Sequence, residues 1–350
     1  MGRAVGKITY SMLDIAKFLC ALLILFYHYF TEHRVLPWIL EESLSLYAVA
    51  VALFMTISGF LTFNKLAEME NTAEKWRYVK KQVFRILKIY LLWSIVYVVF
   101  QLTQWNWSDI SFSFVFWKVQ GWIFNSTYFT IWFMPSLAFG LILAFWMSEK
   151  LPKWLTVVLA ICLYATGSLI SNYYSIGQHI PAIPELAEFA TTWLGGSRGW
   201  LFFGTPLVLL GRGVVKFKNK VHFLPTALLS FACMVLLLAE ALLLRNFFGN
   251  TGIDMVVMMV PVCFSILSFL ISVKLPDSSA YAWMRKMSVL IFVTQRIFLT
   301  VIPAVVTVEF SQKMFENRYV GAVIVCGGTF LLSAMIIMLS NKIKFLRNLY

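Results

Sequence analysis

A lysine and a histidine share one face of the first long apolar segment. Lys17 and His28 are eleven residues apart, which in an α-helix is three turns and an axial separation of about 16 Å. Asp14 and Glu32 fall on the same stripe, within about 60° of both. Imidazole can take and return a proton near neutral pH, so His28 is a candidate catalytic base. A packing or interfacial role for His28, and a simple ion pair between Asp14 and Lys17, remain open alternatives.

A second group of basic residues leads into the third apolar segment. Lys81, Arg85 and Lys88 follow an i, i+4, i+7 pattern and therefore share one helix face. Arg85 and Lys88 lie about one and two turns inside the apolar run, deeper than a basic cytoplasmic loop requires. Snorkelling of both side chains back to the interface is one interpretation. Binding of a polyphosphate is the other.

Two further features place polar or aromatic groups where chemistry is possible. Gln295 and Arg296 lie near the middle of the ninth apolar segment, where an arginine needs a partner. Glu240, Asp14 or a ligand anion are the candidate partners, and the sequence does not choose among them. Tryptophans crowd the segment between the third and fourth apolar runs and the start of the fourth, where Trp132 lies. They indicate an interfacial belt or stacking on a sugar.

The elements that must position these residues are membrane helices. The chain of 350 residues is 60% hydrophobic and 13% charged, about half the charged fraction of a soluble domain. This composition excludes a water-soluble enzyme and a disordered or fibrous chain. Ten apolar runs have the length of a spanning helix, about 20 residues, and are too long for the strands of a membrane barrel. They cover residues 12–31, 45–65, 84–103, 128–148, 154–173, 197–215, 223–245, 253–273, 287–307 and 319–340. We therefore expect an all-α, polytopic bundle of about ten transmembrane helices.

The distribution of charge orients this bundle. With the N-terminus inside, most Lys and Arg residues fall in inner segments. The outer segments hold only Arg34, Lys118, Arg198, Arg245, Lys313 and Arg318. This bias predicts that both termini are cytoplasmic. The net charge of +13 is then explained by anionic lipid or an anionic co-substrate rather than nucleic acid.

The chain is expected to form one membrane domain over residues 1–350, with no appended soluble domain. Its five cysteines all fall inside apolar runs and have no metal-ligand spacing. We therefore expect small buried thiols and no metal site.

The sequence resembles the acyltransferase-3 family of integral membrane acyltransferases. The matching segments occur in the family's order and extend over most of the chain. They are the Lys17/His28 pair, Ser58-Gly59-Phe60, the Arg85/Lys88 pair, Trp132-Phe133-Met134-Pro135, Arg198-Gly199-Trp200 and the run from Ser288 to Gln295. The chain departs from the family pattern with lysine for the commoner arginine at positions 17 and 88. Gln295 replaces a histidine.

The resemblance implies an enzyme that moves an acyl group, usually acetyl, from cytoplasmic acyl-CoA to a hydroxyl of a sugar or related acceptor. His28 would be the general base or acyl acceptor, with Lys17 and Glu32 as catalytic partners. Acetyl-CoA would be the co-substrate, without a metal, and the bacterial plasma (inner) membrane the location. Its binding residues would be Asp14, Lys81, Arg85 and Lys88, and those of a cell-envelope glycan acceptor would be Trp132, Arg198, Gln295 and Arg296.

Two other classes remain open at this point. The same bundle can be a carrier for an envelope polysaccharide or lipid-linked intermediate, in which His28 and Arg296 line a translocation path. It can also be a non-catalytic membrane subunit of an envelope-synthesis complex. The basic site at Arg85 and Lys88 favours the enzyme, because a carrier has no need of a site for coenzyme A.

Overall fold

The computed structural model describes residues 10–32, 47–128, 130–249, 252–305 and 315–350, and within these ranges it contains helices and no strands. Six of the described helical stretches are long and apolar enough to cross a membrane. They are α1 (Ser11–Glu32), α3 (Tyr47–Leu66), α4 (Thr72–Gln104), α11 (Phe223–Phe248), Ser279–Ala304, which begins with α13 (Ser279–Arg296), and α16 (Arg318–Leu339). The chain is therefore an all-helical, multi-pass membrane protein. The count of ten spans and the cytoplasmic placement of both termini stay predictions.

Shorter helices occupy the other apolar runs. They are α6 (Phe133–Lys150), α7 (Lys153–Leu169), the π-helical turn η2 (Trp200–Gly204) with α10 (Thr205–Val215), and α12 (Met259–Ser272). Helix α13 likewise continues through a π-helical turn, η3 (Ile297–Val301), into α14 (Ile302–Val305). Each of the ten predicted runs thus contains a helix, although not each helix has the length of a span.

Helix α4 differs from expectation at its start. It begins at Thr72, well before the apolar run at residue 84, because the Asn71 side chain accepts a hydrogen bond of 2.8 Å from the Ala73 N–H and caps the helix. Lys81 therefore lies on the same continuous helix as Arg85, as their spacing indicated. Two segments between predicted spans were expected to be loops but contain short helices. The segment after α4 contains α5 (Phe112–Phe124), and the segment after α7 contains α8 (Tyr174–Gly177) and α9 (Ile183–Trp193).

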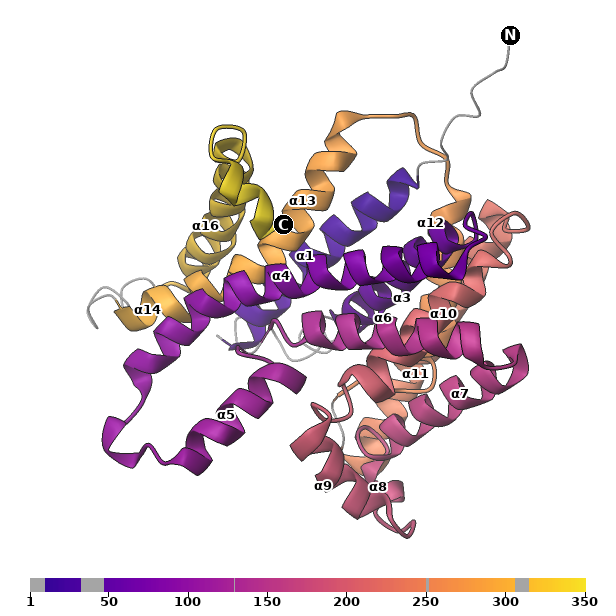
Figure 1. The fold of residues 1–350 in the computed structure, drawn as a ribbon, viewed down its shortest axis with the longest axis horizontal. Helices are drawn as coiled ribbons and strands as arrows, with labels where there is room; N and C mark the ends of the chain where they lie inside the picture. The colour runs from indigo at the N-terminus through magenta and orange to yellow at the C-terminus, as the bar shows by residue number, and fades with distance from the viewer. Residues whose placement is uncertain (1–9, 33–46, 129, 250–251, 306–314) are drawn as a thin grey trace.

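Two helix pairs organise the interior. Helices α1 and α13 lie side by side near the centre of the molecule (Figure 1) and make extensive contact. Helices α3 and α10 also pack closely, because two glycines let their backbones touch. A Cβ atom built on Gly59 would overlap the carbonyl oxygen of Val208, and one on Gly211 would overlap that of Thr56. A larger residue at either glycine would force these helices apart.

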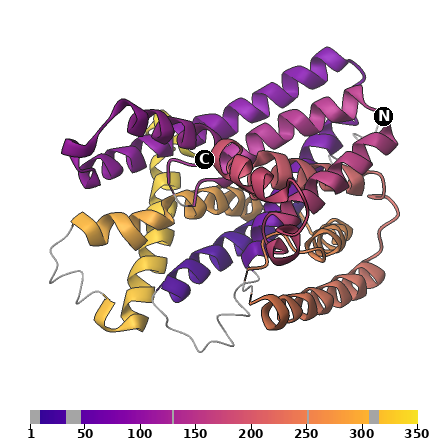
Figure 2. The same cartoon turned by 90° about the horizontal axis from the view of Figure 1, so that it is seen from below.

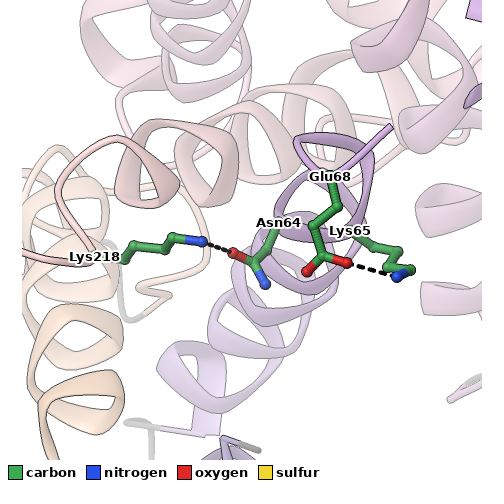
Figure 3. Close-up of polar contacts among 4 residues, drawn as sticks. All are labelled: Asn64, Lys65, Glu68 and Lys218. Atoms are coloured by element: carbon green, nitrogen blue, oxygen red, sulfur yellow. Dashed lines mark hydrogen bonds and ion pairs between the residues drawn. The ribbon is translucent and has the colours of Figure 1, made fainter. Parts of the chain in front are cut away.

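Polar contacts hold the end of α3 that carries Lys65. The Lys218 ammonium, just after α10, donates a 2.6 Å hydrogen bond to the Asn64 side chain (Figure 3). Lys65 forms a 2.6 Å ion pair with Glu68 beside it, and both side chains are about half exposed. The first contact joins two helices, whereas the second is local and contributes little to stability.

Helix α11 lies at the edge of the molecule (Figure 2), and most of its apolar side chains are exposed, as expected for a helix that faces lipid. Its carboxylate, Glu240, has a structural role at the start of α12. It accepts hydrogen bonds of 2.7 Å from the backbone N–H groups of Val257 and Met258, and another from the Tyr173 hydroxyl. Glu240 is therefore not the partner of Arg296.

Candidate active site

Packing of α1 against α13 brings His28 and Arg296 together. The Arg296 Nη2 atom lies 3.3 Å from His28 Nδ1, and its Nη1 atom lies 2.5 Å from the Glu32 carboxylate. The Arg296 side chain is 7% exposed and that of Glu32 is 39% exposed. Arg296 thus bridges two residues of the predicted α1 stripe. Glu32 reaches the histidine through Arg296, not by direct contact.

The bridge has a consequence for the histidine ring. A guanidinium has donors only, so His28 Nδ1 must accept this hydrogen bond, and the neutral ring then carries its proton on Nε2. At 3.3 Å the bond is long. Removal of a proton by His28 therefore requires that Arg296 release the Nδ1 lone pair.

A cavity of about 220 Å³ surrounds the His28 side chain. Trp132, Arg198, Glu32 and Arg296 line it. Thr130 lines it too, and its buried hydroxyl makes no hydrogen bond within the described part of the chain. Buried polar groups normally have partners, so this hydroxyl is a candidate contact for a polar ligand.

Trp132 and Arg198 connect this cavity to a larger one. Both residues also line a neighbouring cavity of about 790 Å³, together with Trp105, Trp117 and Trp122. The Arg198 guanidinium lies 5.3 Å from the centre of the Trp132 ring and 3.7 Å from the Asp254 carboxylate. The predicted substrate residues Trp132 and Arg198 therefore stand between the histidine and an aromatic-lined cavity.

A third cavity, of about 520 Å³, lies toward the other end of α1 and α13. Its lining includes four cationic side chains and, among the described residues, no Asp or Glu side chain. The cations are Lys17, Arg85, Arg285 and Lys286. Asp14 lies beside this cavity, with its carboxylate 3.5 Å from Arg285 Nε. Such a surplus of positive charge at a partly enclosed site favours binding of phosphate groups.

The other two predicted donor residues do not line this cavity. Lys81 is exposed. Lys88 donates a 2.9 Å hydrogen bond to the Asn348 side chain, which lies in the C-terminal helical turn η4 (Lys344–Leu349). Their i, i+4, i+7 pattern with Arg85 is real, but the three side chains have different surroundings.

Gln295 lies next to the site rather than in it. Its side chain is fully buried, donates a 2.9 Å hydrogen bond to the Phe292 carbonyl, and lines neither of the cavities that contain His28 and Lys17. Its Oε1 atom has no hydrogen-bond partner among the described residues.

The π-helical turns lie next to the two arginines that line the His28 cavity. The turn η3 follows Arg296 directly, and η2 begins two residues after Arg198. Such turns locally widen a helix and are frequent at functional sites.

Sequence reasoning missed the part that α13 plays in both cavities. Arg285 and Arg296 are eleven residues apart, the same spacing as Lys17 and His28 on α1. The two pairs meet because the helices lie side by side, with Lys17 and Arg285 at one cavity and His28 and Arg296 at the other. The repeated spacing was a usable signal, but Arg285 precedes the ninth apolar run (287–307) and falls among the basic residues of the inner segments, which the charge distribution alone explains.

Within the described residues no cluster of His, Cys, Asp and Glu could hold a metal ion, and the five cysteines are free thiols. Cys162 is exposed on the surface of α7, whereas Cys233 and Cys263 are buried. The exposed thiol differs from the expectation that all five are buried.

Comparison with known proteins identifies the family. The model of the family described as "Acyltransferase domain" (acyltransferase-3) matches residues 10–338. The chain belongs to the acyltransferase-3 family. The match includes both ends of the α1–α13 pair, so the cationic residues of one cavity and His28 and Arg296 of the other lie within the matched region.

Two relatives carry a different name. An "amino-acid racemase" from Enterococcus faecalis is 23% identical over 337 residues, which is 95% of this chain and 46% of that protein. A "serine/alanine racemase" from Enterococcus gallinarum is 30% identical over 214 residues, 59% of this chain and 29% of that protein. The chain thus spans less than half the length of these curated relatives. No solved structure matches it.

Proposed function

We propose that this protein is a membrane O-acyltransferase of the bacterial plasma membrane that moves an acyl group, by default acetyl, from cytoplasmic acyl-CoA to a hydroxyl of a cell-envelope glycan or related acceptor. One observation carries the proposal. The α1–α13 pair has a cation-lined cavity at one end and a histidine held by a buried arginine at the other. Binding of an anionic donor and chemistry on a hydroxyl need these two kinds of site.

On the donor side, the phosphates of coenzyme A would bind among Lys17, Arg85 and Arg285. These cations surround a 520 Å³ space that is partly closed off from solvent, where charge-assisted hydrogen bonds to phosphate are strong. The thioester would then extend about 16 Å along α1 to reach His28. Asp14 contributes by holding Arg285 at this cavity, 3.5 Å from its carboxylate. We no longer expect direct donor contacts from Lys81 and Lys88.

On the acceptor side, the 790 Å³ cavity would bind the body of the acceptor and the 220 Å³ cavity would receive the reacting hydroxyl. Tryptophan rings stack on the apolar faces of sugars, and Gln101, Gln104 and Asn125 in the larger cavity offer amide groups for sugar hydroxyls. The smaller cavity is below the usual size of a complete ligand site. It therefore fits the tip of an acceptor better than a whole one.

The proposed transfer step uses His28 and Arg296 in sequence. The acceptor oxygen attacks the thioester carbonyl carbon, and His28 takes the proton that this hydroxyl loses. Arg296 moves its hydrogen bond from Nδ1 to the oxygen anion that forms, which frees Nδ1 to accept that proton. The carbon–sulfur bond then breaks, and the proton passes from His28 to the leaving sulfur. The products are the O-acylated acceptor and the free thiol of coenzyme A.

A carrier remains the second candidate. The cavities lie one after the other along the same helix pair, as they would on a translocation path. The names of the two racemase relatives add amino acids to the molecules worth testing as cargo or acceptor. A carrier would move its cargo without release of coenzyme A, and this difference separates the two functions.

The first experiment is acetyl-CoA turnover by the purified protein in proteoliposomes, followed as free-thiol release with and without an envelope-glycan extract. The wild type should release thiol faster with extract, and His28→Ala should lower the rate by about 10²- to 10⁴-fold. His222→Ala is the matched control, because the His222 side chain is exposed and its backbone carbonyl makes the local hydrogen bond. Failure of the folded wild type to bind acetyl-CoA or release thiol would contradict the proposal and favour the carrier.

A further inference from the structure

A phenylalanine separates the two cavities of the α1–α13 pair. Phe292 lines the 520 Å³ cavity that holds Lys17 and also the 220 Å³ cavity that holds His28. Its side chain is buried, at 7% exposure. It lies one helical turn before Arg296 on α13, about 6 Å along the axis. A thioester that travels from the cations to the histidine must therefore pass the level of this ring.

Two further rings complete the wall on the donor side. The ring centres of Phe292 and Phe133, from the start of α6, are 5.5 Å apart, and those of Phe292 and Phe54, from α3, are 6.4 Å apart. Phe54 and Phe133 are themselves 5.8 Å apart, so the three rings form a closed triangle. These separations are typical of packed aromatic rings. Phe54 and Phe133 line the cation-rich cavity, but unlike Phe292 neither lines the His28 cavity.

We propose that Phe292 determines the length of the acyl group that is transferred, admitting acetyl and excluding longer groups; this inference rests on the proposed acyltransferase function. The acyl group is the leading tip of the donor. When its carbonyl carbon is within reach of His28, it shares a 220 Å³ space with the acceptor hydroxyl, and the Phe292 ring occupies the adjoining volume. Extra methylene groups would have to displace this ring or the acceptor.

Removal of the ring gives the donor new space at the thioester. Phe292→Ala would join the two cavities and add the volume of a phenyl ring where a longer acyl chain would lie. Phe54→Ala removes a ring from the same triangle but enlarges only the donor cavity. These two variants therefore separate a change in acyl selectivity from a general loosening of the aromatic packing.

The experiment measures the ratio of acetyl to butyryl transfer, with both donors at equal concentration. The wild type should favour acetyl by about tenfold or more, since a single methylene in a tight apolar pocket already changes a rate by about tenfold. Phe292→Ala should lower this ratio about tenfold, Phe292→Leu should lower it less, and Phe54→Ala should leave it unchanged. Phe292→Leu keeps most of the apolar volume and provides a folded variant if the alanine variant is unstable.

The outcomes distinguish this inference from the proposed function. Wild-type transfer that depends on His28, combined with the same acetyl-to-butyryl ratio in both Phe292 variants, would overturn the inference alone and assign Phe292 to packing. An equal shift of the ratio in Phe54→Ala would also overturn it. Absence of acyl transfer by the folded wild type would overturn the proposed function, and the inference with it.

Discussion

The two ends of the α1–α13 pair hold their cations in different ways. At the donor end, four cationic side chains line the cavity, and Asp14 is the carboxylate that the structure pairs with one of them, Arg285. At the histidine end, both lining arginines have a carboxylate partner, Arg296 with Glu32 and Arg198 with Asp254. One cavity therefore has excess positive charge, whereas the charges of the other are balanced.

This difference matches what each cavity would bind. Excess cationic charge attracts a polyanion and would repel a cationic ligand. Balanced charge around His28 leaves a neutral hydroxyl compound without an electrostatic penalty, and holds the donors of Arg296 ready for an anion that exists only during the reaction. In the proposed function the same residue type, arginine, would serve ground-state binding at one end and transition-state stabilisation at the other.

The largest effect on the rate of acyl transfer is expected from replacing Arg296, the buried arginine of the His28 cavity. Arg296→Met removes the hydrogen bond to His28 and the proposed contact to the oxygen anion, so the rate of acyl transfer should fall by about 10²- to 10³-fold. The affinity for acetyl-CoA should not change, because Arg296 does not line the donor cavity. Steady-state thiol release and acetyl-CoA binding check both statements. A loss of affinity that accounts for the loss of rate would contradict the assignment of Arg296 to the transfer step.

An intermediate effect is expected when one charge is removed from the donor cavity. Lys17→Ala should raise the KM for acetyl-CoA about tenfold, leave kcat and the KM for the acceptor nearly unchanged, and weaken the salt dependence of donor binding. Lys65→Ala is a matched control, since Lys65 is a half-exposed lysine paired locally with Glu68 (Figure 3). Equal affinity of the Lys17 variant and the wild type for acetyl-CoA would refute the donor site.

The smallest effect on the transfer rate is expected from replacing Glu32, the partly exposed carboxylate that pairs with Arg296. The Glu32 side chain is 39% exposed, so solvent screens its ion pair and the coupling is about 0–1 kcal/mol. Glu32→Gln should therefore lower the transfer rate by about fivefold at most, and less at high salt. The measurement is thiol release by the variant across a range of salt concentrations. An unchanged rate at low salt would mean that the Arg296–Glu32 ion pair contributes nothing to the transfer step, and a loss as large as that of Arg296→Met would make Glu32 a catalytic residue.

The sequence could predict the α1 stripe because both helix periodicity and the cost of buried charge act within one segment. Lys17 and His28 face cavities as their spacing indicated. The same reasoning could not choose the partner of Arg296. Glu240, Asp14 and a ligand anion were equally plausible, and Glu32, predicted to be a catalytic partner of His28, was not among them. Which carboxylate reaches an arginine depends on the packing of helices that are far apart in sequence.

Lys88 and Glu240 also show that the partner of a charged residue cannot be read from the sequence. A lysine two turns into an apolar run suggests a ligand, but here the chain's own C-terminal segment satisfies it through Asn348. A carboxylate deep in α11 suggests an ion pair, but it caps the next helix through two backbone N–H groups. In both cases a backbone or amide partner, which has no charge signature in the sequence, replaces the expected charged one.

Contact between helix backbones determines which of the three packed rings, Phe54, Phe133 and Phe292, can move. Gly59 and Gly211 join α3 to α10, and Gly140 brings α6 close to the backbone of Gly204. Phe54 and Phe133 are therefore carried by helices that cannot slide without steric overlap. Phe292 instead stands on α13 just before a π-helical turn, where the regular hydrogen-bond register already changes. A donor that passes the triangle would thus meet two rings on tightly packed helices, Phe54 and Phe133, and one ring, Phe292, next to an irregular helical turn. We therefore expect α13 to be the helix whose position changes when the donor binds.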